Sequence, residues 1–150
     1  MDKRVVITGL GAITPIGKNV EETWNSIKEK KCGIDEITLF NTENFKTKLA
    51  AEVKEYNPLE HFEAKQAKRL DRYSQFAIIA AREAVKSSEI SKENTDFNRV
   101  GIFVSSGIGG LTTIQEQCRI DNEKGNKRVS PMFIPMSIAN MAAGNIAIEF

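Results

Sequence analysis

The stretch from Val100 to Leu111 reads VGIFVSSGIGGL and decides the expected fold. Val100 to Val104 is a short apolar run rich in β-branched residues, which predicts a strand buried on both faces. Gly107 to Gly110 contains three glycines and one bulky residue, Ile108. Glycines permit a sharp turn and a close approach of another group to the backbone. Local sequence alone favours a tight strand-to-helix turn with one core isoleucine, because glycine commonly punctuates loops.

Length and composition limit the possible classes of protein. The 150 residues fit one domain with a real core. Lys and Arg number 21 against 20 for Asp and Glu, so no overall field attracts nucleic acid or an anionic membrane. No apolar run approaches the roughly 20 residues that span a bilayer, and the N-terminus lacks a signal-peptide layout. Cys32 and Cys118 have neither pairing nor metal-ligand spacing, which predicts a reduced, cytoplasmic setting without a metal site.

The N-terminal segment combines a predicted strand, Val5–Thr8, with a glycine-containing turn over Gly9–Gly17. This arrangement could bind a nucleotide phosphate. The dinucleotide fingerprint fails, however, because Thr14 stands where a third glycine is needed and Pro15 interrupts the start of the helix. The Walker pattern also fails, since Asn19 follows Gly17-Lys18 and supplies no hydroxyl for magnesium. A nucleotide-binding α/β domain is therefore a weak hypothesis for this chain.

Two local patterns predict the next elements. Asn19 and Glu22 form a capping-box-like pair, and Val20, Trp24 and Ile27 follow on one helical face, with Gly33 as the C-terminal stop. Farther on, residues 49–53 predict a short strand near a sheet edge.

A long helix is expected from Ala64 to Ser88, and its first part carries a basic stripe at i, i+3, i+4 and i+7. The residues of the stripe are Lys65, Lys68, Arg69 and Arg72. A solvated helix face and a dock for an acidic partner are equally good interpretations of these charges. Lys127 and Arg128 form a second small basic site.

The C-terminal part predicts a helix over residues 111–121, then an extended apolar segment through Phe133 and Ile134 that two prolines fix. Ser137 is expected to cap a following helix of small residues. Because strands alternate with helices along the chain, the predicted class is α/β. Cys32 has no histidine near it in sequence and is interpreted as structural, and His61, the one histidine, is more readily an ordinary exposed residue than a catalytic base.

Three segments together resemble a known family. They are KRVVITGLGAITPIG from Lys3 to Gly17, SSGIGGL from Ser105 to Leu111, and SPMFIP at residues 130–135 with NMAAG at residues 140–144. In order and spacing they resemble the N-terminal part of the β-ketoacyl-acyl carrier protein synthases, and most of all the synthase II branch of bacterial fatty acid synthesis. Each segment alone is weak, but the combination covers the whole chain.

The resemblance implies a thiolase-like fold of α-β-α-β-α layers, of which this chain is roughly the N-terminal half, and a cytoplasmic homodimer without cofactor. Enzymes of the family move an acyl chain from acyl carrier protein to a cysteine, decarboxylate malonyl-carrier protein, and join the two to give a 3-oxoacyl-carrier protein. Ile108 corresponds to the gate of the acyl tunnel, and Phe133 and Ile134 to the far end of the acyl pocket across the dimer interface. Lys65, Lys68 and Arg69 correspond to the basic helix that docks the carrier protein, and Lys127 and Arg128 to a second patch of that dock.

The chain departs from the family at its catalytic residues. In the family, the nucleophilic cysteine lies one strand beyond the NMAAG helix, and two histidines and a lysine belong to the C-terminal half. Residues 1–150 end at Phe150, and Cys32, Cys118 and His61 match none of these groups. We therefore expect no catalytic residue in this part of the synthase domain and no activity from it alone. The alternative is a non-catalytic interaction protein, a truncated paralogue that binds acyl carrier protein or a full-length synthase.

Overall fold

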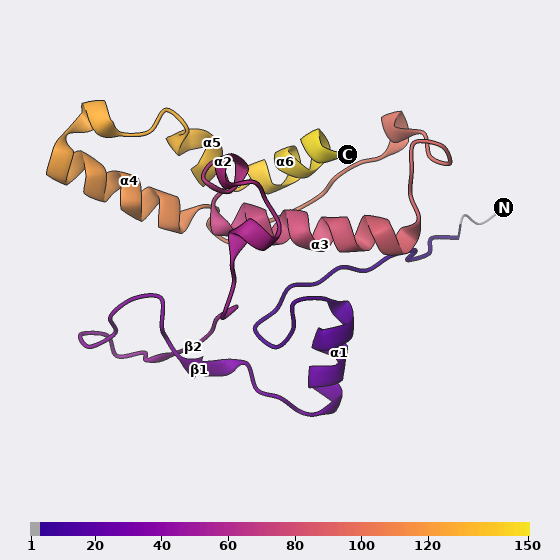
Figure 1. Ribbon diagram of the computed structural model, residues 1–150, viewed down its shortest axis with the longest axis horizontal. Coiled ribbons are helices and arrows are strands. Elements are labelled where there is room, and N and C mark those ends of the chain that lie inside the picture. The colour runs from indigo at the N-terminus through magenta and orange to yellow at the C-terminus, as the bar shows by residue number, and fades with distance from the viewer. Residues whose placement is uncertain (1–3) are drawn as a thin grey trace. The chain divides into compact units, whose positions relative to one another are not determined.

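The structure is a computed structural model that describes residues 4–150, so Lys3 of the first matching segment lies outside the described residues. The chain divides into two compact units. The first unit is the chain up to Tyr56 together with Arg82–Ile90, and the second is Asn57–Ala81 together with Ser91–Phe150. Helix α3 (Arg72–Ser88) contributes residues to both units (Figure 1).

The first unit contains helix α1 (Val20–Lys28), whose predicted start is confirmed. The Asn19 side chain accepts the backbone N–H of Glu22 at 2.8 Å, and the Glu22 carboxylate accepts the N–H of Lys18 at 2.8 Å. These two bonds satisfy donors that a helix N-terminus otherwise leaves free. The helix ends at Lys28, and Lys30 takes the left-handed conformation with φ 58°. Gly33 is therefore not the stop that the sequence predicted, because the turn is completed before the chain reaches it.

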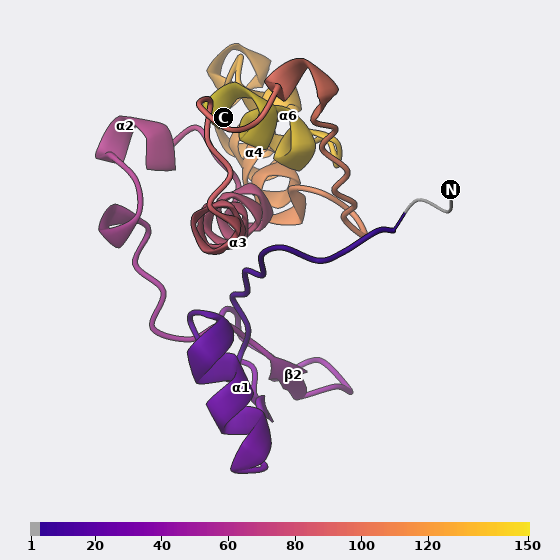
Figure 2. The ribbon, with the colours of Figure 1, turned by 90° about the vertical axis from the view of Figure 1, so that its right-hand side faces the viewer.

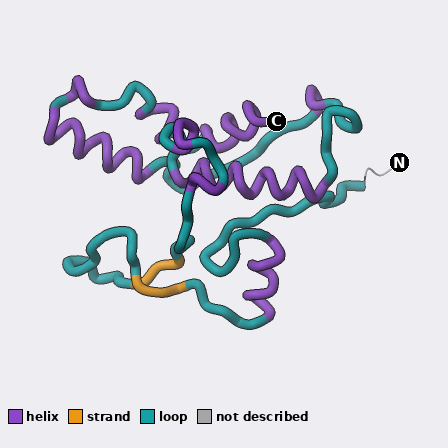
Figure 3. Tube along the Cα trace, in the orientation of Figure 1, coloured by secondary structure: helices purple, strands orange, loops and turns teal. Residues whose placement is uncertain are grey.

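Strands β1 (Ile34–Glu36) and β2 (Leu49–Ala51) pair antiparallel in the same unit, with Ile34 opposite Ala51. This pair is the sheet in the described part of the chain (Figure 3) and confirms the short strand expected near residue 49. Figure 2 shows α1 and β2 next to each other, and Thr23 and Ile27 of α1 share one apolar hollow with residues of the hairpin.

The prediction of buried strands at Val5–Thr8 and Val100–Val104 is wrong, because neither segment forms a strand. Both segments are loop in Figure 3, and the side chains of Val5 and Phe103 are each 95% exposed. A strand is held by hydrogen bonds to a neighbouring strand, and within residues 4–150 neither segment has one. The apolar pattern is real, but most of its side chains stay exposed within residues 4–150, and only Ile102 and Val104 are partly covered.

The second unit is helical. It contains α2 (Ala64–Ala67), α4 (Leu111–Lys124), α5 (Phe133–Ser137), α6 (Met141–Glu149) and three short 3₁₀ turns, η1 (Pro58–Glu60), η2 (Phe97–Arg99) and η3 (Asn126–Arg128). Figure 1 shows the chain running out along α4, through η3, and back to α5, which contacts α4. The apolar core of this unit consists of Phe62, Ile78, Ile79, Ala142 and Ile146. No helix between residues 4 and 150 is long and apolar enough to cross a membrane.

A single helix was expected over residues 64–88. The structure has two helices instead, because a non-helical turn from Lys68 to Asp71 interrupts it. Asp71 immediately precedes α3: its backbone carbonyl accepts the N–H of Gln75 at 3.1 Å, and its carboxylate accepts the N–H of Tyr73 at 3.3 Å. The buried Gln75 amide then donates to the carbonyls of Ala67 and Leu70, at 3.0 and 2.9 Å. The Gln75 side chain thus adds a donor to the carbonyl at the end of α2 and another to the turn that follows, where helical hydrogen bonding stops.

The segment around Phe133 and Ile134 is helix α5 rather than the extended chain that its prolines predicted. Pro135 is the third residue of α5. It is tolerated there because the first N–H groups of a helix have no intrahelical acceptor to lose. Ser137 ends α5 instead of capping the next helix, which begins at Met141 after Asn140.

The carboxylate of Glu52 ties the hairpin to the loop that follows β1. It accepts the N–H and O–H of Thr38 at 3.0 and 2.8 Å, and these bonds, led by the N–H, lower the pKa of Glu52 below its ordinary value of 4.5. The ionised form therefore stabilises the hairpin above pH 4.5, and this contribution is lost as the pH falls through the lowered pKa.

We expect amide exchange at Thr38 and Leu39, followed by NMR, to accelerate on acidification beyond its ordinary pH dependence. Glu52→Gln should remove this step, and the exposed neighbour Glu43→Gln should keep it; an unchanged profile in Glu52→Gln would contradict the assignment.

Candidate functional site

The glycine turn, residues 105–110, lies against the end of α5. The N–H of Gly110 donates to the carbonyl of Ser137 at 2.9 Å, and the N–H of Gly109 donates to Ser106 Oγ at 2.9 Å. Gly109 has φ 82°, and a Cβ atom there would lie 2.4 Å from the Ser137 carbonyl oxygen. Only glycine meets both requirements, since other residues rarely adopt this φ and would overlap that oxygen.

Ile108 projects from this turn with 64% of its surface exposed. It is therefore not the core isoleucine that the local sequence favoured. Phe133 is half-buried and Ile134 is 56% exposed, and both belong to α5, to whose last residue the turn is bonded. The turn that carries Ile108 is thus bonded to the helix that carries Phe133 and Ile134. Ile108 and Ile134 present apolar surface to solvent.

Asp71 contacts both the glycine turn and the start of α4. Its side chain is buried, and its Oδ2 accepts the N–H of Thr113 at 2.9 Å and the O–H of Thr113 at 2.6 Å. A Cβ atom on Gly110 would lie 2.9 Å from the same oxygen, so the turn passes directly against the carboxylate. Sequence reasoning did not single out Asp71 or Thr113. The available signal was the spacing of residues 71, 74, 75, 78 and 79, which form the buried face of α3.

The basic candidates are exposed but form two separate groups. Lys65 lies in α2, Lys68 ends it, and Arg69 lies in the turn that follows, so the predicted single-helix stripe does not exist. Arg72 is turned to an aromatic neighbour, with its guanidinium carbon 5.1 Å from the centre of the Phe76 ring.

Lys127 and Arg128 form the second group, in η3, and Arg128 lines a surface hollow with Ile120 and Lys124. The first group lies just before Asp71, which contacts the start of α4, whereas η3 follows the end of α4 (Figure 1). The two groups therefore lie toward opposite ends of α4, which is roughly 21 Å long at 1.5 Å per residue.

Residues 4–150 show no assembled nucleophile. Cys32 and Cys118 are exposed free thiols, and the ring of His61 lies beside that of Phe62 with centroids 6.4 Å apart. Among the residues that the structure describes, no group of His, Cys, Asp and Glu could hold a metal ion.

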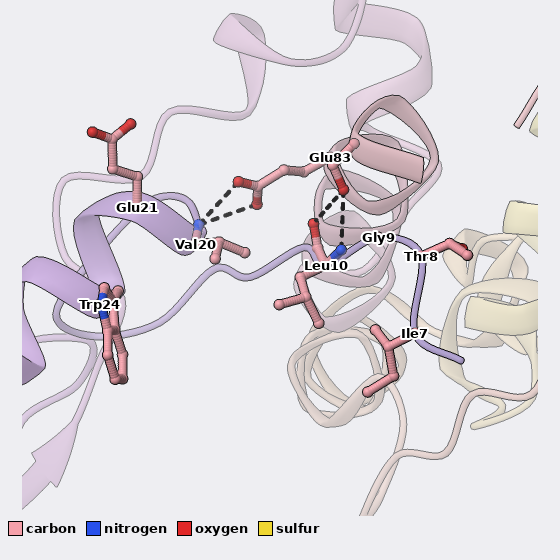
Figure 4. A pocket seen from close by; sticks show the side chains of 9 residues that line it. Ile7, Thr8, Gly9, Leu10, Val20, Glu21, Trp24 and Glu83 are labelled. Carbon is pink, nitrogen blue, oxygen red and sulfur yellow. Dashed lines mark hydrogen bonds between the residues drawn. The ribbon is translucent and has the colours of Figure 1, made fainter. Parts of the chain in front are cut away.

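The geometry of the N-terminal turn opposes nucleotide binding. The Glu83 carboxylate accepts the N–H of Ala12 at 2.9 Å. It also accepts the N–H of Val20, the first residue of α1, at 3.0 Å (Figure 4). A carboxylate thus occupies the helix N-terminus where a phosphate would bind, and would repel one. The adjoining hollow, of about 750 Å³, has mostly apolar walls that include Ile7, Leu10 and Trp24.

Solved structures of similar shape define the class of protein: the chain has the fold of a ketosynthase. It matches a type II PKS ketosynthase, solved in complex with its acyl-carrier protein and bound to the hexaketide, with TM-score 0.79 and 23% identity over 99% of this chain and 39% of that chain. The ishigamide ketosynthase/chain length factor matches with TM-score 0.76 and 26% identity, over 96% of this chain and 36% of that one. The predicted thiolase-like α/β class is confirmed by this likeness.

Sequence comparison then gives the family. The family model described as "Beta-ketoacyl synthase, N-terminal domain" matches residues 2–150, and the chain belongs to this family. It is 44% identical over 148 residues to 3-oxoacyl-[acyl-carrier-protein] synthase 2 of Staphylococcus aureus strain N315, covering 99% of this chain and 36% of the relative. The protein of the same name in Synechocystis is 40% identical over 147 residues, 98% of this chain and 35% of the relative. The chain thus spans about a third of the length of these curated relatives.

The glycine turn offers a matched pair of substitutions. Gly109→Ala places a Cβ against the Ser137 carbonyl at a left-handed φ and should lower the free energy of unfolding by about 1–2 kcal/mol or more. Gly107→Ala meets no atom within 4 Å and should cost little. Urea unfolding followed by circular dichroism measures both. Equal stability of the two variants would show that the turn does not lie against α5 as described.

Proposed function

We propose that this chain is the N-terminal part of a 3-oxoacyl-acyl carrier protein synthase of fatty acid elongation. The observation that carries the proposal is the 40–44% identity to synthase 2 enzymes over nearly the whole chain. The proposed enzyme takes an acyl chain from acyl carrier protein onto a cysteine as a thioester. It then decarboxylates malonyl-carrier protein and joins the two-carbon unit to the acyl group, giving a 3-oxoacyl-carrier protein.

Within this enzyme, residues 1–150 supply binding surfaces rather than the reacting groups. Exposed Ile108 is the proposed gate to the acyl tunnel, and its glycine turn supplies the backbone freedom to move it. Phe133 and Ile134 are proposed to line the far end of the acyl pocket in a homodimer, where the exposed surface of Ile134 is covered by the partner subunit. The cysteine nucleophile and two histidines are proposed to lie beyond Phe150, so the domain in residues 1–150 stops short of the catalytic groups.

The proposed macromolecular partner is acyl carrier protein, an acidic protein that the two basic groups suit. Lys65, Lys68 and Arg69 form the first contact, and Lys127 and Arg128 form the second. Exposed cations of this kind steer an acidic partner and fix its orientation more than they add affinity. One of the structural neighbours is itself a ketosynthase in complex with an acyl-carrier protein, which supports this choice. A cytoplasmic location follows from the proposed function.

A binding-only role is the second candidate, favoured by the exposed, unpaired thiols and the single histidine of residues 1–150. Condensation assays separate the two. The full-length gene product should release CO₂ from malonyl-carrier protein and form 3-oxoacyl-carrier protein, whereas residues 1–150 alone should not. A full-length product that binds carrier protein without turnover would establish the binding-only role.

The gate assignment predicts the outcome of enlarging Ile108. In the full-length enzyme, Ile108→Phe should lower kcat/KM for long acyl-carrier proteins by about tenfold, the effect of roughly 1.4 kcal/mol in the barrier. Ile108→Val, which conserves shape, should stay close to the parent. The side chain is mostly exposed, so both variants should unfold at the parent's urea concentration. Equal loss for short and long acyl chains would argue against a gate.

The docking assignment predicts the outcome of charge reversal. Changing Lys65, Lys68 and Arg69 together to Glu should weaken carrier-protein binding by at least about tenfold, because each exposed ion pair contributes up to about 1 kcal/mol and reversal adds repulsion. The loss should shrink in high salt. Exposed Lys92→Glu is the matched control and should bind as the parent does. Isothermal titration calorimetry measures all three proteins, and unchanged binding by the triple variant would exclude this dock.

A further inference from the structure

We propose that Asp71 is a positioning residue that couples the docking segment to the gate, so that docking of carrier protein changes the position of the turn that carries Ile108. The inference rests on the proposed function, in which Lys65, Lys68 and Arg69 dock the carrier protein and Ile108 gates the acyl tunnel. We assign Asp71 no role in the reaction itself. Its place between the two surfaces gives it a role in connecting them.

The first step concerns the carboxylate as a junction. Asp71 is 6% exposed, and its Oδ2 accepts two bonds from Thr113, the third residue of α4. A charged acceptor makes hydrogen bonds roughly twice as strong as a neutral one, and burial makes leaving either partner unsatisfied costly. The starts of α3 and α4 are therefore held together at one oxygen atom.

The second step concerns the gate side of this junction. Gly110 leads directly into α4, and a Cβ on it would come within 2.9 Å of Asp71 Oδ2. The N–H of Ile114 donates to the Gly110 carbonyl at 2.9 Å, and the N–H of Gly110 donates to Ser137. The space beside Gly110 is thus too small even for a methyl group, and a shift of the carboxylate toward the turn would displace the turn.

The third step concerns the docking side. Arg69 is two residues before Asp71, in the turn between α2 and α3. This turn is held by the N–H of Arg69, which donates to the carbonyl of Gln66 at 2.9 Å, and by side-chain bonds. Gln75, 6% exposed, supplies them by donating to the carbonyls of Ala67 and Leu70. Force applied to Lys68 or Arg69 by a docked partner thus passes through a short, bonded segment to Asp71. Packed side chains and hydrogen-bond networks are the contacts through which coupling between two sites can be carried, and these residues form such a network.

Hydrogen exchange measured by mass spectrometry on the full-length protein tests the coupling. The probe is the carrier protein in its apo form, which lacks the prosthetic arm and so cannot reach the tunnel. In the parent protein, its addition should change exchange of the peptide spanning residues 106–111 by about threefold or more. In Asp71→Asn the change should vanish while calorimetric affinity for the carrier protein remains within about twofold. Asp121→Asn, an exposed acid of α4, is the matched control and should behave as the parent does.

Thr113→Val provides a second variant, should Asp71→Asn fail to fold. It removes the O–H donor and keeps the side-chain shape, and it should also abolish the response of residues 106–111; the exposed neighbour Thr112→Val should not. A response that persists in both Asp71→Asn and Thr113→Val overturns the coupling. Absence of any carrier-protein binding by the parent instead overturns the proposed function, so the two failures are distinguishable. Loss of affinity in Asp71→Asn equal to the loss of response would show a merely structural role and would also overturn it.

Discussion

The bond between the Asp71 carboxylate and Thr113 is the constraint on which the second unit depends. It joins the start of α3 to the start of α4, and it sets the glycine turn against α5 through Gly110. The face of α3 that packs inward carries polar Asp71, Ser74 and Gln75 followed by apolar Ile78 and Ile79. One end of the helix is thus fixed by directional bonds and the adjoining part by non-directional packing. Directional bonds define a geometry that apolar packing alone leaves adaptable.

The first unit is held differently. Its buried side chains are Ser26 and Glu52, and none of the buried apolar side chains of residues 4–150 lies in it. Its order comes from carboxylates placed on backbone amides: Glu83 on Ala12 and Val20, Glu52 on the loop after β1, and Glu22 on Lys18. Three acidic side chains thus add directional bonds to a unit in which no described apolar side chain is buried. The same placement of Glu83 is what makes the N-terminal turn unsuitable for a phosphate.

The sequence predicted local features well and non-local ones poorly. The Asn19–Glu22 cap was predicted correctly because its partners are three residues apart. The strands at Val5–Thr8 and Val100–Val104 were not, because a strand exists only with a partner that the pattern does not name. Pro135 misled because a proline in the first turn of a helix and one in an extended segment look alike. Among candidate residues, Lys65 and Lys68 were proposed from charge spacing and Ile108 from the resemblance, whereas Asp71 was not proposed because a lone aspartate carries no motif.

The uncovered apolar side chains of Val5, Ile7 and Phe103 have a consequence for how the protein is made. In a chain as long as its relatives, residues 1–150 leave the ribosome while the rest is still being translated. At roughly 5–20 residues per second, synthesis of the remaining two thirds takes tens of seconds. During that time these segments are open to association with other nascent chains, and they match the exposed apolar stretches that chaperones bind. In such a chain, slower translation lengthens this exposure and favours association before folding is complete.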